Sequence, residues 1–221
     1  NRPLSPNSTI GLDDRAAHYV SRVLRMPEGA SVVLFNGDGL DYHAEIVGVQ
    51  RQDVRVRLGE GINPGNESTL ELNLVQALSR GDRMDYCLQK ATELGVSRIQ
   101  LLDTERVELR LKAARLEKRM SHWRGVIISA CEQSGRARVP ELGAPVTLTH
   151  WLTSKDPSRR LILAPQANLP LASVPIDGEP VSVMVGPEGG FSQSEVGQAL
   201  AEGVERGRQR PRRRRPPVCR I

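Results

Sequence analysis

The sequence has few of the residues that would mark a disulfide-bonded, metal-binding or membrane-spanning protein. Its 221 residues include three cysteines and four histidines, with no Cys-x-x-Cys pair and no spacing typical of metal ligands. No apolar run approaches the roughly 18 residues that a membrane helix needs, and no signal peptide is visible. We therefore expect a cytoplasmic protein with no metal site and no membrane partner.

Aromatic residues are also scarce, and the basic charge is unevenly distributed. The seven aromatic residues argue against a platform on which single-stranded bases stack. The net charge is +5, but eight arginines and no acidic residue occur from Arg206 onward. Residues 1–205 carry 23 basic and 26 acidic residues, so the body of the chain has a net charge of −3. Contact with nucleic acid would therefore need local basic patches rather than a global field.

The stretch around which the chain is organised is 181–195, which reads Val-Ser-Val-Met-Val, Gly-Pro-Glu-Gly-Gly-Phe and then Ser-Gln-Ser-Glu. Its alternating valines predict a short buried strand. Pro187 and the three glycines cannot continue that strand. Ser192 and Glu195 form a capping box, which predicts that a helix begins there. In an α/β fold, a strand, a glycine loop and a helix N-terminus in this order bind small polar ligands through backbone amides.

The glycine loop has two interpretations from the residues alone, because many such loops are only turns. It is not a P-loop, since no Gly-Lys-Ser/Thr follows, and the Gly-x-Gly-x-x-Gly spacing of a dinucleotide site is absent. Three glycines and a carboxylate within five residues are more typical of a ligand loop than most turns are, so both interpretations stay open. The residues thus predict a pocket lined by backbone, with one acidic side chain, that of Glu188.

The chain changes its pattern at about residue 67. Residues 1–66 predict a small β-rich domain, with a short helix capped by Asp13 or Asp14 and strands at 31–35, 42–49 and 54–58. From residue 67 to 205, strands at 70–77, 98–102, 161–164 and 181–185 alternate with helices, which predicts a parallel sheet. The arginines of the first part, such as Arg22 and Arg25, fit either a solvated face or a nucleic-acid contact.

Residues 116–130 have the strongest helical period in the chain, and Gly135 is a candidate for the helix C-terminal cap. The polar exit of this helix, 131–136, fits either a functional segment or a frayed end. Residues 206–221 are rich in arginine and proline with little apolar content, which indicates a solvated tail. A tail that binds RNA and an error in the reading frame near Arg206 are two further interpretations, of which we favour the second.

Five motifs, in their order along the chain, give the sequence a specific resemblance. They are His18-Tyr-Val-Ser-Arg22-Val-Leu-Arg25, Lys90-Ala-Thr-Glu93-Leu-Gly-Val, Glu105-Arg106, Ala130-Cys-Glu132-Gln133-Ser-Gly135-Arg136 and Val185-Gly-Pro-Glu-Gly-Gly-Phe191. With these motifs the chain resembles the bacterial 16S ribosomal RNA uridine-N3 methyltransferases of the SPOUT superfamily, over roughly residues 1–205.

The resemblance implies an α/β protein with two domains and a tail. Residues 1–66 would form a PUA-like β-barrel that helps to hold RNA, and residues 67–205 a SPOUT-type methyltransferase domain with a trefoil knot. Residues 206–221 would be an aberrant tail that leaves the knot incomplete. The family implies a homodimer that acts on 16S rRNA or the small ribosomal subunit and uses S-adenosyl-L-methionine.

The resemblance also implies roles for individual residues. The cofactor would lie against Leu163, Ala164, Val185, Gly186, Pro187, Glu188, Gly189 and Gly190. RNA contacts would come from Arg22, Arg25, Lys90 and Arg106. Methylation of uridine N3 requires that its proton leave, so a base or an anion-stabilising group is needed. Glu188, Glu132 and Arg136 are the candidates, and the sequence does not assign their roles.

The chain departs from the family after the helix that follows the glycine loop. Family members continue with a strand and a Leu-Gly-x-Arg-x-Leu-Arg-x-Glu-Thr-Ala segment that closes the cofactor pocket. Here the arginine-proline tail stands in that place, so we expect weak binding of S-adenosyl-L-methionine or none. Two alternatives are a non-catalytic RNA-binding protein and a SPOUT methyltransferase that acts on another RNA.

Overall fold

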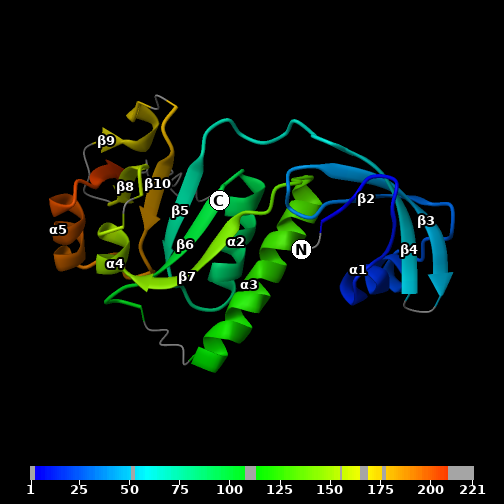
Figure 1. The fold of residues 1–221 in the computed structure, drawn as a ribbon. Helices are drawn as coiled ribbons and strands as arrows, with labels where there is room; N and C mark the ends of the chain where they lie inside the picture. Colours follow the sequence, from blue (N-terminus) through cyan, green and yellow to red (C-terminus); the bar gives the residue numbers. More distant parts are fainter. Residues whose placement is uncertain are drawn as a thin grey trace, which may run out of the picture. The chain divides into compact units, whose positions relative to one another are not determined.

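A computed structural model describes residues 3–50, 53–107, 113–154, 156–164, 169–175 and 178–208 (Figure 1). The chain divides into two compact units. The first contains Asn1–Glu67 and Ile127–Val139, and the second contains Ser68–Val126 and Pro140–Ile221. The long helix α3, Ala113–Ser134, contributes residues to both.

The first unit is built on a four-stranded antiparallel sheet in the order β1-β4-β3-β2. Its strands are β1 (Thr9–Gly11), β2 (Ser31–Leu34), β3 (Asp41–Gln50) and β4 (Asp53–Ile62). Alternate residues of β3 and β4 point inward, so Ile46, Val54 and Val56 are fully buried in one core. The three strands that we predicted from alternation are confirmed, and β1 was missed because it is only three residues long.

A short helical segment precedes β2. The α-helix α1 (Asp14–His18) begins at Asp13, whose carboxylate accepts a hydrogen bond from the Ala16 amide at 2.8 Å. The backbone then changes to a π-helix, η1 (Tyr19–Val23). It ends near Arg25, which has a φ of 51°, an uncommon conformation for a side chain of this size.

The second unit contains a seven-stranded, entirely parallel sheet in the order β7-β6-β5-β10-β8-β11-β9. The strands are β5 (Leu72–Ala77), β6 (Arg98–Asp103), β7 (Glu141–Thr147), β8 (Arg159–Leu163), β9 (Leu169–Pro170), β10 (Val181–Val185) and β11 (Glu205–Arg208). The predicted α/β architecture with a parallel sheet is confirmed.

Helices α2 (Asp82–Glu93), α4 (Leu148–Leu152) and α5 (Gln193–Ala201), with the 3-10 turn η2 (Leu171–Ser173), connect these strands. Helix α2 lies beside α3, where Asp85 accepts a hydrogen bond from the indole of Trp123 at 3.1 Å and lies 2.7 Å from His122 (Figure 1). Helix α4 lies beside α5. Gly135 has a φ of 73°, which confirms the left-handed residue that we predicted after α3.

The strand order places a switch point at the centre of the sheet. From β5 the chain proceeds outward through β6 and β7, and the later strands β10, β8, β11 and β9 lie on the other side of β5. In open α/β sheets, ligands bind outside the carboxyl ends of the strands where the order reverses. The segments that follow β5 and β10 therefore occupy the expected ligand-binding edge.

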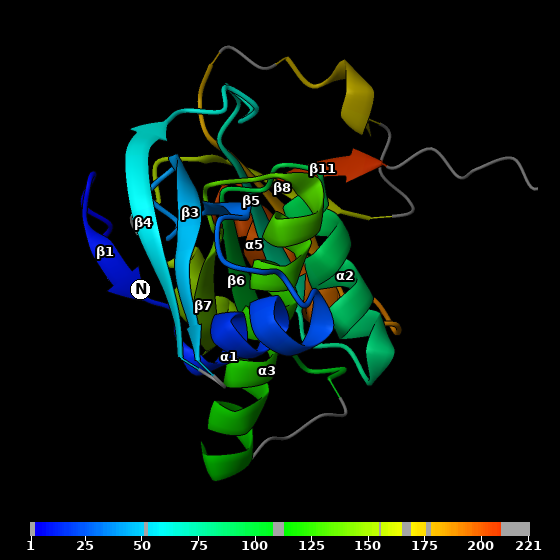
Figure 2. The same cartoon turned by 90° about the vertical axis from the view of Figure 1, so that its right-hand side faces the viewer.

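Residues 206–208 differ from our expectation, because they form most of β11 rather than the start of a tail. The strand lies beside β8 (Figure 2) and pairs with β8 and β9. Glu205 forms a fork with Arg159 through two contacts of 2.8 Å. Pairing on both sides outweighs the weak strand propensity of Glu-Arg-Gly-Arg. Residues 209–221 of the predicted tail lie outside the described residues.

Within the described part of the chain, no helix is both long enough and apolar enough to cross a bilayer.

The capping box at the start of α5 allows a test of this part of the fold. The Ser192 hydroxyl accepts from the Glu195 amide at 3.1 Å, and the Glu195 carboxylate accepts from the Ser192 amide at 2.8 Å. We expect Ser192→Ala to lower the free energy of unfolding by about 1 kcal/mol, measured by urea denaturation. The exposed Ser173→Ala in η2 is the control, with a change within about 0.5 kcal/mol. Equal effects of the two changes would contradict the role of the cap.

Candidate functional site

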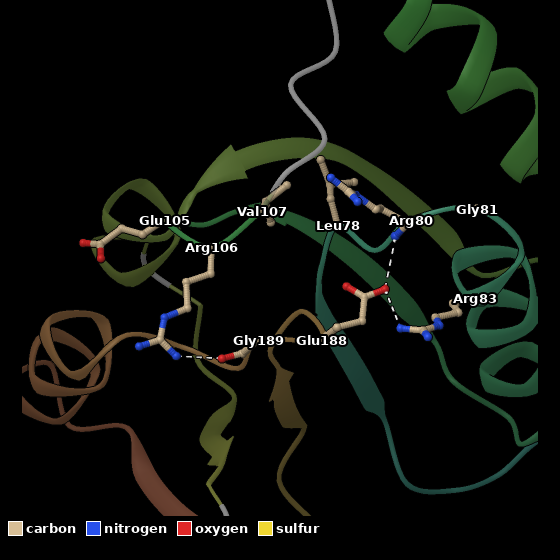
Figure 3. A pocket seen from close by; sticks show the side chains of 9 residues that line it. All are labelled: Leu78, Arg80, Gly81, Arg83, Glu105, Arg106, Val107, Glu188 and Gly189. Carbon is tan, nitrogen blue, oxygen red and sulfur yellow. Dashed lines mark hydrogen bonds and ion pairs between the residues drawn. The ribbon is translucent and has the colours of Figure 1, made fainter.

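A pocket of about 750 Å³ lies at the carboxyl ends of β5, β6 and β10 in the second unit (Figure 3). It is lined by Leu78, Arg80, Gly81, Arg83, Glu105, Arg106, Val107, Glu188 and Gly189, which we call the arginine pocket. The loops after three neighbouring parallel strands supply these residues. The pocket thus lies at the switch point of the sheet, where a ligand site is expected.

The loop after β6 is fastened at two points, one on the glycine loop and one at the start of α5. The guanidinium of Arg106 donates to the Gly189 carbonyl at 2.6 Å (Figure 3). The Glu105 amide donates at 2.8 Å to Glu195, whose side chain is almost fully buried at the start of α5. These contacts place Arg106 against the glycine loop.

Glu188 joins the glycine loop to the segment that follows β5. Its Oε1 atom accepts from the Arg80 amide at 3.4 Å and lies 3.2 Å from Nη1 of Arg83 (Figure 3). A hydrogen bond from its own backbone amide, with those from Arg80 and Arg83, lowers the pKa of Glu188 below its usual value, against a smaller opposing effect of burial. The carboxylate therefore stays ionised at neutral pH and is a weak proton acceptor.

The glycine loop is tight at one end and open at the other. A Cβ atom on Gly186 would lie 3.1 Å from the Phe191 amide nitrogen and 3.2 Å from Gly190, so a side chain would require the backbone to move. Gly190 has a φ of 67°, and a Cβ atom there would meet nothing within 4 Å. The loop thus exposes backbone that a ligand can approach closely.

The eight residues predicted to bind the cofactor lie at the ends of two adjacent strands. Leu163 ends β8 and Ala164 follows it, while Val185 ends β10 and begins the segment that continues to Gly190. Because β8 and β10 pair in parallel, these two segments emerge at the same edge of the sheet. Glu188 and Gly189 also line the arginine pocket, and the other six predicted residues do not.

Two of the predicted catalytic residues belong to the first unit and have partners there. Arg136 is almost fully buried and forms a fork with Glu67, with contacts of 3.1 Å from Nε and 2.7 Å from Nη2. Glu132 is exposed and accepts from Arg15 at 2.9 Å. Next to this fork, the side-chain amide of Asn66 donates a hydrogen bond to the Gly135 carbonyl at 2.6 Å. Arg136 thus fastens the exit of α3 to the segment that follows β4.

The residues predicted to bind RNA are distributed over both units. Arg22 and Arg25 are exposed at the end of the π-helix in the first unit. In the second unit, Arg106 lines the arginine pocket, whereas Lys90 lies on α2 in an ion pair of 2.6 Å with Glu93 and does not line the pocket. Only Arg106 is thus brought together with the glycine loop.

The described cysteines are poor candidates for nucleophiles. Burial raises the pKa of Cys131 to about 11, although Arg136 lowers it in part. Burial also raises the pKa of the Cys87 thiol, which donates to Gln76 at 3.3 Å. Both therefore stay protonated at neutral pH. Among the described residues, no group of three or more His, Cys, Asp and Glu side chains is placed to hold a metal ion.

Sequence reasoning missed four residues that shape these sites, namely Glu67, Arg80, Arg83 and Glu195 as a partner of Glu105. Nothing in the local sequence after β5 shows that Arg80 and Arg83 face a loop more than 100 residues away. The capping box identified Glu195 only as a cap. The contact that each residue makes depends on the order of strands in the sheet, which the sequence patterns did not specify.

The fork between Arg136 and Glu67 allows a comparison of a buried and an exposed ion pair. The Arg136 side chain is 6% exposed, so Arg136→Ala leaves a partly buried carboxylate without its partner. We expect a loss of about 3 kcal/mol in the free energy of unfolding, measured by urea denaturation. Arg15→Ala, which breaks the pair with Glu132 at 55% and 42% exposure, should cost less than about 1 kcal/mol. A smaller loss for Arg136→Ala than for Arg15→Ala would overturn this assignment.

The lowered pKa of Glu188 predicts a pH dependence. A carboxyl whose pKa is lower in the folded state contributes stability above its unfolded pKa, near 4.5, and loses it as the pH falls through the folded value. We therefore expect Glu188→Gln to be less stable than the unchanged protein at neutral pH. Below about pH 4.5 the difference should shrink. Thermal unfolding of both proteins between pH 3 and 7 measures it, and a difference that grows on acidification would contradict the assigned direction.

Comparison with known proteins identifies the family to which the two parts of the chain belong. Residues 66–212 match the model of an RNA methyltransferase domain, and residues 12–59 match that of an RNA methyltransferase PUA domain. Among curated proteins, the ribosomal RNA small subunit methyltransferase E of Rickettsia conorii is 30% identical, over 89% of this chain and 79% of the relative. The protein of the same name from Buchnera aphidicola (from Schizaphis graminum) is 28% identical, over 90% and 82%.

Solved structures agree with these matches. A methyltransferase from Legionella pneumophila, in complex with S-adenosylmethionine, has a TM-score of 0.90 and 36% identity, over 96% of this chain and 87% of that one. The ribosomal RNA small subunit methyltransferase E of Neisseria gonorrhoeae, bound to the same cofactor, has a TM-score of 0.90 and 33% identity over the same shares. The chain therefore belongs to the RNA methyltransferase family that includes ribosomal RNA small subunit methyltransferase E.

Proposed function

We propose that the protein transfers a methyl group from S-adenosyl-L-methionine to N3 of a uridine in 16S ribosomal RNA. The observation that carries this proposal is the match of residues 66–212 to the RNA methyltransferase domain, together with a glycine loop at the switch point of the sheet. Relatives named ribosomal RNA small subunit methyltransferase E support the RNA substrate. The N3 position follows from the resemblance of the five motifs to the uridine-N3 enzymes.

The ends of β8 and β10 would hold the cofactor, through Leu163, Ala164 and the segment from Val185 to Gly190. The open side of Gly190 and the exposed backbone of the loop fit a ligand that is bound largely by main-chain groups. When bound, S-adenosyl-L-methionine supplies a methyl group already activated by its sulfonium. The protein therefore mainly needs to align the two reactants and exclude water.

The three catalytic candidates have different roles in this proposal. Glu188 acts as an ionised anchor that fixes the glycine loop, because its lowered pKa makes it a weak base. Arg136 is a positioning residue, because its guanidinium is buried against Glu67. Glu132 keeps an exposed carboxylate paired with Arg15, and it stays a candidate proton acceptor.

Loss of the N3 proton leaves a negative charge delocalised over the uracil ring. In our proposal, the cationic side chain of Arg106, beside the glycine loop, stabilises this anion as the proton passes to water or to a carboxylate. N3 then forms its bond to the methyl carbon, and the bond between that carbon and sulfur breaks with its electron pair left on sulfur. The products are N3-methyluridine and S-adenosylhomocysteine.

Further features follow from the family resemblance. We propose that residues 67–205 carry a SPOUT-type trefoil knot that the C-terminal tail leaves incomplete, and that the protein acts as a homodimer in the cytoplasm, where ribosomes are assembled. We propose that residues 1–66 form the PUA-like domain, where Arg22 and Arg25 contact RNA phosphates and Lys90 of the other domain adds a further contact. The departure of residues 209–221 from the family pattern supports weak cofactor binding.

Two measurements test the reaction. The protein is incubated with S-adenosyl-L-methionine and unmodified small subunits, and digested 16S rRNA is analysed by mass spectrometry for N3-methyluridine. Calorimetric titration with the cofactor is made on this chain and on a version whose residues 209–221 carry the family-like closing segment. We expect N3-methyluridine from the version that binds the cofactor, and tight binding by the original chain would refute the proposed defect at residues 209–221.

Other outcomes lead to the alternatives. Methylation of a different RNA would retain the enzyme class and reject the substrate. RNA binding without cofactor binding by either version would favour a non-catalytic RNA-binding protein.

A further inference from the structure

Two arginines of the arginine pocket have no place in the mechanism above. Arg80 lies in the turn that leads from β5 into α2, and Arg83 lies in the first turn of α2. Both residues are exposed and line the pocket. We propose that Arg80 and Arg83 form a phosphate-binding subsite that holds the RNA backbone next to the target uridine. This inference rests on the proposed function, because it assigns the place where the substrate of that reaction enters.

The charge of the pocket favours RNA over the cofactor as its occupant. Three arginines and two glutamates line it, and the apolar lining side chains are those of Leu78 and Val107. S-adenosyl-L-methionine carries a positive sulfonium and a positive ammonium against one carboxylate, so arginines do not attract it as a whole. An RNA backbone carries one negative charge per nucleotide, and neutralising such charges with arginine drives binding.

The shape of the donor groups indicates phosphate rather than base recognition. None of the nine lining residues is aromatic, so the pocket offers no ring on which a base could stack. A guanidinium presents its N–H groups as a planar fork that matches two oxygens of one phosphate. The volume of about 750 Å³ is within the range of pockets that hold a ligand of nucleotide size.

The glycine loop holds this subsite in place and leaves the Arg83 side chain largely exposed. The carboxylate of Glu188 fixes the backbone of Arg80 through its amide at 3.4 Å and contacts Arg83 through Nη1 alone at 3.2 Å (Figure 3). The Arg83 side chain remains 72% exposed, so this ion pair is weak and leaves other N–H groups directed to solvent. A phosphate can therefore bind Arg83 while Glu188 keeps the turn oriented towards the loop that precedes α5.

Arg106 completes the arrangement on the opposite loop. Its Nη1 atom donates to the Gly189 carbonyl at 2.6 Å, so its guanidinium is held beside the glycine loop. Phosphates at Arg80 and Arg83 would thus place the attached nucleotide between the turn after β5 and Arg106. The bound RNA would therefore have one orientation, with its phosphate backbone on the α2 side of the pocket and the uracil base on the side of the glycine loop.

The test compares Arg80→Ala and Arg83→Ala with Arg124→Ala, an exposed arginine of α3 that does not line the pocket. The KM for small subunits should rise about tenfold in each pocket variant, with kcat reduced less than about threefold, because a charged hydrogen bond to substrate is lost. The substitutions are made in whichever version of the protein, original or with the family-like closing segment, binds the cofactor. The affinity for S-adenosyl-L-methionine, measured by calorimetry, should be the same in the variants as in that parent. Arg124→Ala should match the parent.

A binding measurement provides a readout that does not depend on activity. A fluorescein-labelled single-stranded RNA that contains the target uridine is titrated by anisotropy at several salt concentrations. Each pocket variant should reduce the slope of log affinity against log salt by about 0.7, the value for one lost phosphate contact with a single strand. Arg83→Lys keeps the charge and should restore most of this slope but less of the affinity, because lysine lacks the fork. If Arg83→Ala fails to fold, Arg83→Lys still tests the contribution of the guanidinium to RNA binding.

The outcomes separate this inference from the proposed function. Variants that match the parent in KM and salt slope, while the parent makes N3-methyluridine, overturn the subsite and leave the function standing. A loss of cofactor affinity with unchanged RNA binding gives the pocket to the cofactor and also overturns the subsite. A parent that binds RNA but methylates no uridine, with variants that lose that binding, retains the subsite and rejects the function.

Discussion

The candidate site depends on one buried carboxylate, that of Glu195. Its two oxygens accept hydrogen bonds from the amides of Ser192 and Glu105, so one side chain satisfies backbone donors from two segments that are distant in sequence. The residue is 3% exposed, and its burial is tolerated because both of its carboxyl oxygens have backbone hydrogen-bond donors. Without this carboxylate, the start of α5 and the loop after β6 would each keep an unsatisfied amide, and Arg106 would lose its fixed position.

The parallel sheet explains why such a contact exists at all. Parallel strands need crossover connections, so the loops that follow them gather at one edge although they are distant along the chain. At this edge the turn after β5, the loop after β6 and the glycine loop after β10 are neighbours. Each loop is joined to the glycine loop or to the helix behind it by a hydrogen bond from or to one side chain, that of Glu188, Arg106 or Glu195. The strands of the sheet thus bring the loops together, and hydrogen bonds of these three side chains fix the loops against one another.

Local patterns predicted those elements whose cause is local. The capping box at Ser192 and Glu195, the left-handed Gly135 after α3 and the strand at 181–185 were all correct, because each depends on residues within one turn or one strand. The bounds of β5 and β6 differ from the expectation by one or two residues at an end. The change of pattern at about residue 67 indicated two parts, and the family resemblance identified them as a PUA-like part and a methyltransferase part.

The elements that were missed depend on distant partners. Strand β7 contains Gly143 and Pro145, which are unfavourable in a central strand, but it lies at the edge of the sheet beside an irregularity in its pairing with β6. Gln100 of β6 donates to the Ala144 carbonyl at 2.7 Å next to this irregularity. Strand β11 was assigned to a tail because its sequence is polar, and it forms because β8 and β9 pair with it on both sides. Tertiary pairing outweighs propensity in both cases.

The distribution of charge connects these observations with the proposed chemistry. Residues 1–205 have a net charge of −3, so this part of the chain does not attract RNA through its overall field. Positive charge is instead concentrated locally by the fold, where the parallel sheet brings Arg80, Arg83 and Arg106 to one pocket. The carboxylate of Glu188 lies next to Arg83, which limits local repulsion, and Glu195 fixes the loop that carries Arg106 through the Glu105 amide. An enzyme that must stabilise a developing uracil anion benefits from cations whose positions are set before the substrate arrives, because no reorganisation is then needed during the reaction.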